Sequence, residues 1–187
     1  MQKKIQDIFQ ESVRVKQKTL EANAQNIASA IKELTEALGK KKKLLIFGNG
    51  GSAADSQHIA AEFVGRFQKE RQAWPGIALT TDSSILTALS NDYSFDIVFA
   101  RQIEGLGKKG DIAFGISTSG NSKNVIAAIQ KAKELGLKTI TLTGNDSGQV
   151  AKLSDLSIVV SSQKTARIQE SHLCIYHTIC ELVENQF

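Results

Sequence analysis

Apolar residues recur at helical spacing through the first forty residues of the chain. One stripe consists of Ile5, Ile8, Phe9 and Val13, and a second consists of Ile27, Ile31, Leu34 and Leu38. Steps of three and four residues put each stripe on one face of an amphipathic helix, so we predict two helices here. Gly39 predicts the C-terminal end of the second helix.

Short apolar runs then alternate with helical stretches. The runs that predict strands are 43–47, 77–80, 111–116, 139–143 and 156–160. Helices are expected between them, mainly over 52–67, 83–105 and 122–135, with a long final helix over 165–186. This alternation predicts an α/β fold, in which a five-stranded parallel sheet carries helices on both faces.

The chain length of 187 residues suits a single domain. We expect this domain to span 1–187, with 1–39 as a helical extension. The helices at the two ends of the chain carry more apolar surface than is required to cover a five-stranded sheet. We therefore infer that other copies of the chain cover them in a homo-oligomer.

Composition narrows the classes of function. Hydrophobic residues make up 41% and charged residues 22%, as in ordinary globular proteins. No apolar run approaches the roughly 20 residues of a membrane span, and the charged N-terminus does not predict a signal peptide. The net charge of +4 comes without a nucleic-acid recognition motif or an aromatic stacking platform, so we expect no nucleic acid as a partner. Because no apolar run is long enough to span a membrane, we expect no membrane partner either.

The two cysteines indicate a reducing compartment. Cys174 and Cys180 lie six residues apart in the expected final helix, too far for a disulfide. We expect both to be reduced core thiols and the protein to be cytoplasmic.

Two loops follow predicted strands, at the sheet edge where ligands of parallel sheets bind. The first, 48–52, reads Gly-Asn-Gly-Gly-Ser. By itself it is compatible with a tight turn, and it also matches the dinucleotide pattern G-x-G-x-x-A. The dinucleotide interpretation is weak because no acidic residue ends the second strand about 20 positions later.

The second loop is richer in hydroxyl groups. Its hydroxyl residues are Ser117, Thr118, Ser119 and Ser122. One side chain is enough to cap a helix, whereas a phosphate accepts hydrogen bonds from several hydroxyls and from the amides of a helix N-terminus. We predict a phosphate-binding loop.

Candidate proton-transfer residues lie on two of the expected helices. His58 and Glu62 are four residues apart and share a face. Gln169 and His177, eight residues apart, share one side of the final helix, whereas His172 points elsewhere. Taken singly, these residues fit a solvated pair and a core histidine. Together they suit general acid–base chemistry or a divalent metal such as zinc.

These motifs together resemble the sugar isomerase (SIS) domain superfamily and, within it, the bacterial phosphoheptose isomerases. The stretches that carry the resemblance are 47–52, 57–63, 65–67, 91–92, 115–122, 141–144 and 166–172, with His177. The resemblance implies a flavodoxin-like SIS fold without an organic cofactor. It implies conversion of D-sedoheptulose 7-phosphate to D-glycero-D-manno-heptose 7-phosphate, the first step towards the heptose of bacterial surface polysaccharide. It also implies a homotetramer with active sites between subunits.

The resemblance also implies roles for individual positions. The implied substrate-binding residues are Asn49, Gly50, Gly51, Ser52, Glu62, Asn91, Asp92, Ser117, Thr118, Ser119, Ser122 and Gln169. The implied zinc ligands, for one ion per subunit, are His58, Glu62, Gln169 and His177, with Glu62 and His177 also the acid–base pair. Ala166 stands where some relatives carry Asp, so no supporting carboxylate is expected there. A metal held by Glu62 and His177 would act as a Lewis acid or occupy a resting site that substrate remodels, and the sequence leaves both open.

Two other classes of protein share the fold. Bacterial replication-initiator-associating proteins resemble the isomerases throughout, which makes a non-catalytic SIS scaffold the alternative function. That group lacks counterparts of Glu62 and His177, and this chain has both. A sugar-phosphate sensor would carry a DNA-binding domain, for which 187 residues leave no room.

Overall fold

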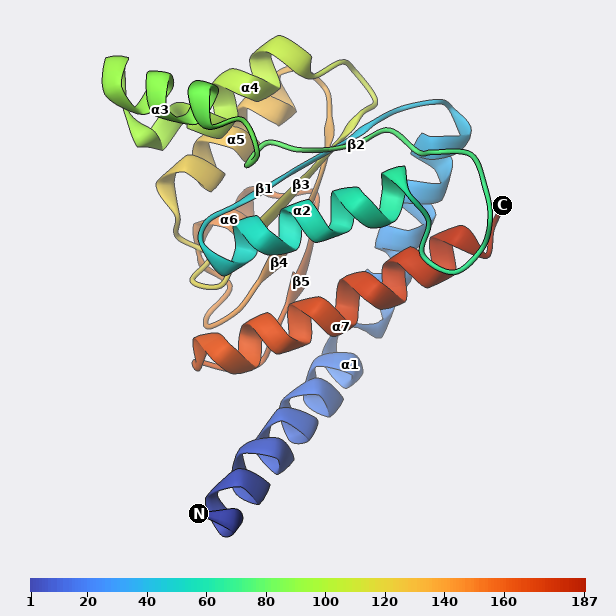
Figure 1. Ribbon diagram of the computed structural model, residues 1–187, viewed down its shortest axis with the longest axis vertical. Helices are drawn as coiled ribbons and strands as arrows, with labels where there is room; N and C mark the ends of the chain where they lie inside the picture. The colour runs from blue at the N-terminus through green and yellow to red at the C-terminus, as the bar shows by residue number, and fades with distance from the viewer.

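The computed structural model describes residues 1–187 and contains one five-stranded parallel sheet (Figure 1). The strands are β1 (Leu44–Gly48), β2 (Gly76–Ala78), β3 (Ile112–Ser117), β4 (Lys138–Thr143) and β5 (Leu156–Val159). They lie in the order β2-β1-β3-β4-β5, and all neighbouring strands are parallel. The five predicted strands and the flavodoxin-like α/β architecture are thus confirmed.

Helices cover both faces of the sheet (Figure 1). One face carries α1 (Gln2–Gly39), α2 (Gly51–Val64) and α7 (Thr165–Glu184). The other carries α3 (Ser83–Asp92), the 3-10 helix η1 (Phe95–Ile97), α4 (Val98–Leu106), α5 (Lys123–Glu134) and α6 (Gly148–Leu153). The helix expected over 83–105 is therefore broken into three pieces, and α6 was not predicted. Successive β1 residues alternate between two buried clusters, with Leu44 and Ile46 on one face and Leu45 and Phe47 on the other.

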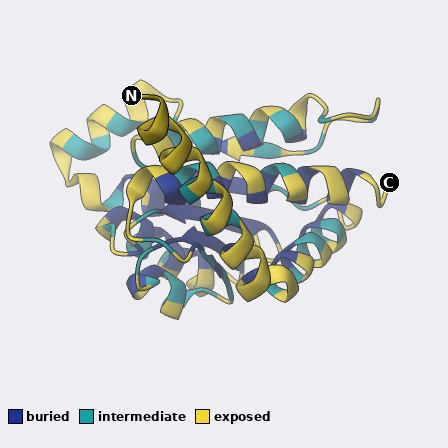
Figure 2. Cartoon of the chain, turned by 90° about the horizontal axis from the view of Figure 1, so that it is seen from below, coloured by how far each residue is buried: buried dark blue, intermediate teal, exposed yellow.

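The first 39 residues form one helix, so the prediction of two separate helices was wrong. Residues 2–38 contain neither Gly nor Pro, and nothing in them stops a helix between the two apolar stripes. Gly39 is its last residue, as predicted. In the second stripe Ile27, Leu34 and Leu38 are buried in the core and Ile31 packs against it, partly buried. The first stripe, which includes Phe9 at 69% exposure, faces solvent (Figure 2).

Helix α1 also covers the edge strand β5. The buried Asn23 exchanges two hydrogen bonds with Val159, since its Nδ2 donates to the carbonyl and its Oδ1 accepts from the backbone N–H, both at 3.0 Å. Asn26 Nδ2 donates to the Ser157 carbonyl at 3.0 Å. These amides satisfy backbone groups that an edge strand otherwise leaves open to another strand.

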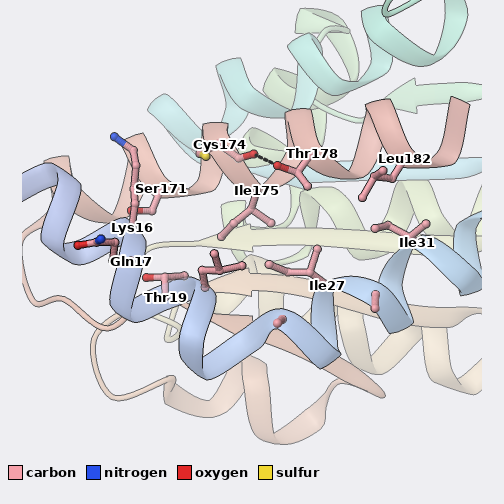
Figure 3. A pocket seen from close by; sticks show the side chains of 13 residues that line it. Lys16, Gln17, Thr19, Ile27, Ile31, Ser171, Cys174, Ile175, Thr178 and Leu182 are labelled. Carbon is pink, nitrogen blue, oxygen red and sulfur yellow. Dashed lines mark hydrogen bonds between the residues drawn. The ribbon is translucent and has the colours of Figure 1, made fainter. Parts of the chain in front are cut away.

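An apolar groove of about 440 Å³ runs between α1 and α7 (Figure 3). Leu20, Ile27 and Ile175 line it, together with Cys174. Cys174 is exposed and Cys180 is buried, and both are free thiols. The prediction that both are core residues was wrong for Cys174, because six residues turn a helix by about 600° and leave the two side chains on different sides of α7.

The strand order reverses between β1 and β3, and this reversal fixes where a ligand can bind. Gly48, at the end of β1, is in register with Ile116 near the end of β3. The loops that leave these two strands therefore open at the same sheet edge, as predicted for the two candidate anion loops. No helix in the fold combines the length and apolar character needed to span a bilayer.

His172 attaches α7 to the sheet. Its buried ring places Nε2 3.0 Å from the Thr143 carbonyl oxygen, and Nδ1 has no partner. Burial lowers the pKa of His172 to about 4, although the Thr143 carbonyl favours the protonated form. The expectation that His172 points away from the other site residues is confirmed.

His172 should make the protein less stable in mild acid. Its imidazole takes up a proton near pH 6.5 in the unfolded chain and only near pH 4 in the fold, so its contribution is complete above pH 6.5 and is lost below it. Between pH 7 and pH 5 this should lower the free energy of unfolding by about 2 kcal/mol. Denaturant unfolding at fixed protein concentration measures the effect. His172→Gln, whose amide still reaches the Thr143 carbonyl, should lack it, and equal pH slopes in both proteins would contradict the assignment.

Candidate functional site

Helices α2 and α7 lie side by side and run in the same direction across one face of the sheet (Figure 1). At the start of both helices, a β-carbon on Gly51 would come within 2.1 Å of Gln169 Nε2. About two turns further along, His58 Nε2 lies 3.4 Å from His177 Nε2. We call this line of contact the α2–α7 seam. It brings the predicted residues of the two helices together, and Gln169 and His177 share a side of α7 as expected.

Three side chains meet in the middle of the seam. His58 Nε2 lies 2.9 Å from Glu62 Oε1, one helical turn away, and the His58 and His177 rings pack edge to face at 5.0 Å. One potential ligand atom from each of His58, Glu62 and His177 lies within 4.8 Å of the others. All three residues are half-buried, so a small ligand can reach them. The predicted juxtaposition is confirmed.

His177 is adapted to be neutral at neutral pH. Burial and, after it, repulsion from His58 lower the pKa of His177, while Glu62 acts in the opposite direction. The ring of Phe67 lies 5.4 Å from the His177 ring and covers it from the loop after α2. A neutral imidazole in this position can accept a proton or bind a metal.

Two residues that the sequence did not predict, Tyr176 and Asp55, lie on the Nδ1 side of His58, away from Glu62. The Tyr176 hydroxyl lies 3.0 Å from His58 Nδ1 and 3.4 Å from Asp55 Oδ1. Burial raises the pKa of Asp55, although the bond from Tyr176 favours its ionised form, and burial also raises the pKa of Tyr176. Such partners orient an imidazole and fix its tautomer. The only signal for them in the sequence is that Asp55 precedes His58 by three residues and Tyr176 adjoins His177.

The cluster of three fits a single divalent metal ion. Two imidazole nitrogens and one carboxylate oxygen form a donor set that zinc accepts. Ligand atoms about 2.0 Å from a tetrahedral ion lie roughly 3.3 Å apart, and the 3.4 Å between the two histidine nitrogens is close to that spacing. The fourth residue expected from the sequence, Gln169, points its amide at Gly51 in this conformation.

The glycine loop bends tightly at the start of α2. A β-carbon on Gly48 would lie 2.8–2.9 Å from Ser52 and the Ile116 carbonyl, and Gly50 has a positive φ of 56°. No side chain caps α2, and the Ser52 and Ala53 N–H groups donate to the Asn49 and Gly50 carbonyls at 2.9 and 3.0 Å, so the Gly51 N–H is the amide of the first turn that is open to an anion. Asn49 exchanges two amide hydrogen bonds of 2.9 and 2.8 Å with the buried Asn124 of α5, which joins this loop to the next one.

The serine loop runs from the end of β3 to the start of α5. Ser117 and Ser122 share a hydrogen bond of 3.0 Å between their hydroxyls, and Ser119 Oγ accepts from the Asn121 N–H at 3.2 Å. Gly120 has a φ of 66° and packs against the backbone of Ser147, leaving no space for a side chain. No side chain caps α5 either. Four hydroxyls and an uncapped helix end at one turn are the chemistry expected of a phosphate site.

Asn91 and Asp92 lie away from the seam, at the exposed end of α3. The Asn91 amide donates to Asp92 Oδ1 at 2.9 Å, and neither residue hydrogen-bonds to the seam or the serine loop. The adjacent η1 packs on α5, where Asp96 pairs with Lys123 at 3.8 Å. The structure thus places Asn91 and Asp92 on the side of the molecule that carries α5.

Known proteins share both the sequence and the fold. The SIS domain family matches residues 8–144. The phosphoheptose isomerase of Aquifex aeolicus (strain VF5) is 53% identical over 184 residues, which cover 98% of this chain and 96% of the relative. The solved phosphoheptose isomerase of Neisseria gonorrhoeae superposes with a TM-score of 0.93 at 42% identity, covering 98% of each chain. The solved phosphoheptose isomerase of Francisella tularensis superposes with a TM-score of 0.94 at 36% sequence identity, and the match covers 98% of this chain and 97% of that chain.

These relatives are named as isomerases, and they lend no support to the scaffold alternative. Likeness extends over almost the whole chain, including the strand that leads into the serine loop and both helices of the seam. The chain belongs to the SIS-domain family of phosphoheptose isomerases.

Proposed function

We propose that this protein interconverts D-sedoheptulose 7-phosphate and D-glycero-D-manno-heptose 7-phosphate, at the start of bacterial heptose synthesis. The observation that carries the proposal is the meeting of Glu62 and His177 in a half-buried cluster beside two uncapped helix ends. A ketose–aldose exchange needs paired proton-transfer groups close to an anchored phosphate. The names of the relatives support the choice of substrate.

The serine loop holds the phosphate in this proposal. Its hydroxyls, from Ser117, Thr118, Ser119 and Ser122, and the first amides of α5 donate to the phosphate oxygens. The sugar is contacted by Asn49, Gly50, Gly51, Ser52 and Gln169. Asn91 and Asp92 lie away from the seam of their own subunit, so in this proposal they contact the sugar in a site formed between subunits. Binding energy from the phosphate then orients the reacting carbons at the other end of the substrate.

Glu62 and His177 carry out the proton transfers. Glu62 removes a proton from C1 of the ketose, which forms a cis-enediol, and returns it to C2 to give the aldose. His177 gives its ring N–H proton to the oxygen on C2 and takes one back from the oxygen on C1, so the ring is neutral before and after the exchange, as its lowered pKa favours. Tyr176, through its contact with Nδ1, keeps His58 turned towards Glu62.

One zinc ion per subunit would be held by His58, Glu62 and His177, with Gln169 as a fourth candidate. When bound, such an ion supplies a Lewis acid that polarises the sugar carbonyl. Tyr176 contributes to this site by leaving His58 Nε2 directed at the cluster.

A homotetramer accounts for the apolar surface of α1. Ile5, Ile8, Phe9 and Val13 are each about half exposed or more. The groove between α1 and α7 is apolar as well, and helices of further copies would cover both surfaces. Residues 1–39 thus act as the oligomerisation extension of a single domain spanning 1–187, and location in the cytoplasm stays a prediction.

Removing either proton-transfer group should abolish most of the activity. Glu62→Gln and His177→Gln keep the shape of each side chain, and each should lower kcat with sedoheptulose 7-phosphate by about 10²-fold or more. Glu181→Gln, on an exposed face of α7, serves as the matched control and should turn over normally. Near-normal kcat in both site variants would refute the assignment.

Zinc should bind once per subunit, and its binding should depend on the seam. Metal analysis after dialysis against zinc and then buffer should give about one ion per chain, and His58→Gln should reduce it to a small fraction. His172→Gln removes a buried histidine outside the cluster and should retain the ion. Equal zinc content in all three proteins would exclude this metal site.

Phe9→Glu should break the assembly, because it places a charge in the exposed apolar stripe of α1. Light scattering coupled to size exclusion should show a mass below that of four 20.3 kDa chains. Lys18→Glu adds the same residue about half a turn round the same helix, outside the stripe, and should leave the mass unchanged. A Phe9→Glu protein that keeps the wild-type mass would argue against the proposed interface.

A further inference from the structure

The segment 65–75 joins the end of α2 to β2 without regular secondary structure, and one carboxylate holds it in place. Glu184, buried at the end of α7, accepts backbone N–H bonds from Phe67, Gln68 and Lys69 at 3.1, 2.7 and 2.8 Å. It also pairs with Arg71 Nε at 3.0 Å. Burial by itself raises the pKa of Glu184, but these donors outweigh it and hold the pKa below its ordinary value. The segment is therefore bound to an ionised carboxylate.

Arg71 reaches back from this segment to α2. Its Nη2 donates to the Glu62 carbonyl at 2.7 Å and its Nη1 to the Phe63 carbonyl at 3.0 Å. Carbonyls of the last helical turn have no partner within the helix, and a cation there also matches the helix dipole. The guanidinium lies 3.5 Å over the ring centroid of Trp74, which limits its freedom further. One side chain thus links the backbone of Glu62 to the end of α7.

Glu184 and the segment that it binds also lie close to His177. Glu184 follows His177 by seven residues, or about two turns of α7, so both face the seam. Phe67, whose N–H is held by Glu184, places its ring 5.4 Å from the His177 ring. The Arg71–Glu184 pair therefore links the end of α2 to the end of α7 and holds the segment whose Phe67 ring covers His177.

We propose that Arg71 and Glu184 are positioning residues for the reaction, and that their ion pair sets Glu62 against His177. The inference rests on the proposed function, in which these two groups exchange protons with the sugar. Proton transfer depends on placement to within about half an ångström, and neither Arg71 nor Glu184 need touch the substrate to provide it. The buried Arg71–Glu184 ion pair at the end of α7 thus contributes to the reaction as well as to the stability of the fold.

Arg71→Lys tests the proposal because it keeps the charge but loses the planar fork that serves a carboxylate and two carbonyls at once. It should lower kcat at least ~10-fold while KM for sedoheptulose 7-phosphate changes less than ~3-fold. The KM should hold because the phosphate loops adjoin the opposite end of the 14-residue α2. Trp74, the single tryptophan, should shift its emission when Arg71 is replaced.

Asp111→Asn is the matched control. Asp111 is a buried carboxylate that accepts from the N–H groups of Lys43 and Lys108 and pairs with the Lys43 ammonium, at the sheet edge opposite the site. Its loss should lower stability, as the Arg71 change does, while leaving kcat and the Trp74 emission as they are. An equal fall of kcat in both variants would show a purely structural effect and overturn the proposal.

A third readout needs neither substrate nor metal. The chain has three histidines, so the ring signals of His58, His172 and His177 can be followed separately by NMR. Arg71→Lys should displace the His58 and His177 signals and leave that of His172 in place, and Asp111→Asn should move none of them. A wild-type protein without turnover would refute the proposed function, and the histidine signals would still decide the positioning role. Unmoved His58 and His177 signals in Arg71→Lys would overturn it.

Discussion

The parallel packing of α2 against α7 is the constraint on which the site depends. The two helices are separated by about a hundred residues of chain, yet they lie on the same face of the sheet and advance in step. Their contacts begin at Gly51 and Gln169, pass through His58 and His177, and end where Glu184 binds the segment after α2. A slip of one turn would move each group by about 5.4 Å and separate the cluster.

Each end of this helix pair has a different chemical character. The N-terminal ends adjoin the two loops at the reversal of strand order, where uncapped amides and hydroxyls favour an anion. The C-terminal end is closed by the Arg71–Glu184 ion pair and by aromatic rings. The imidazoles and the Glu62 carboxylate lie between the two. A substrate with phosphate at one end and a carbonyl at the other matches this polarity.

Helix α1 divides its length between two tasks. Its second half completes the core and uses the Asn23 amide to satisfy the edge strand β5. Its first half extends past the domain with exposed apolar side chains (Figure 2). One uninterrupted helix can serve both because no glycine or proline breaks it before its last turn.

The sequence by itself determined the sheet, the main crossover helices and the grouping of the candidate site residues along single helices. Apolar periodicity identified all five strands, and spacing along single helices placed His58 with Glu62 and Gln169 with His177, because these patterns are local. The structure alone decided what depends on distant segments. It placed Tyr176 and Asp55 behind His58, turned Cys174 outward, and put Asn91 and Asp92 on α3 away from the seam. It also joined Arg71 to Glu184 across 113 positions, a contact with no periodic signal because it arises only when two helices pack in one register.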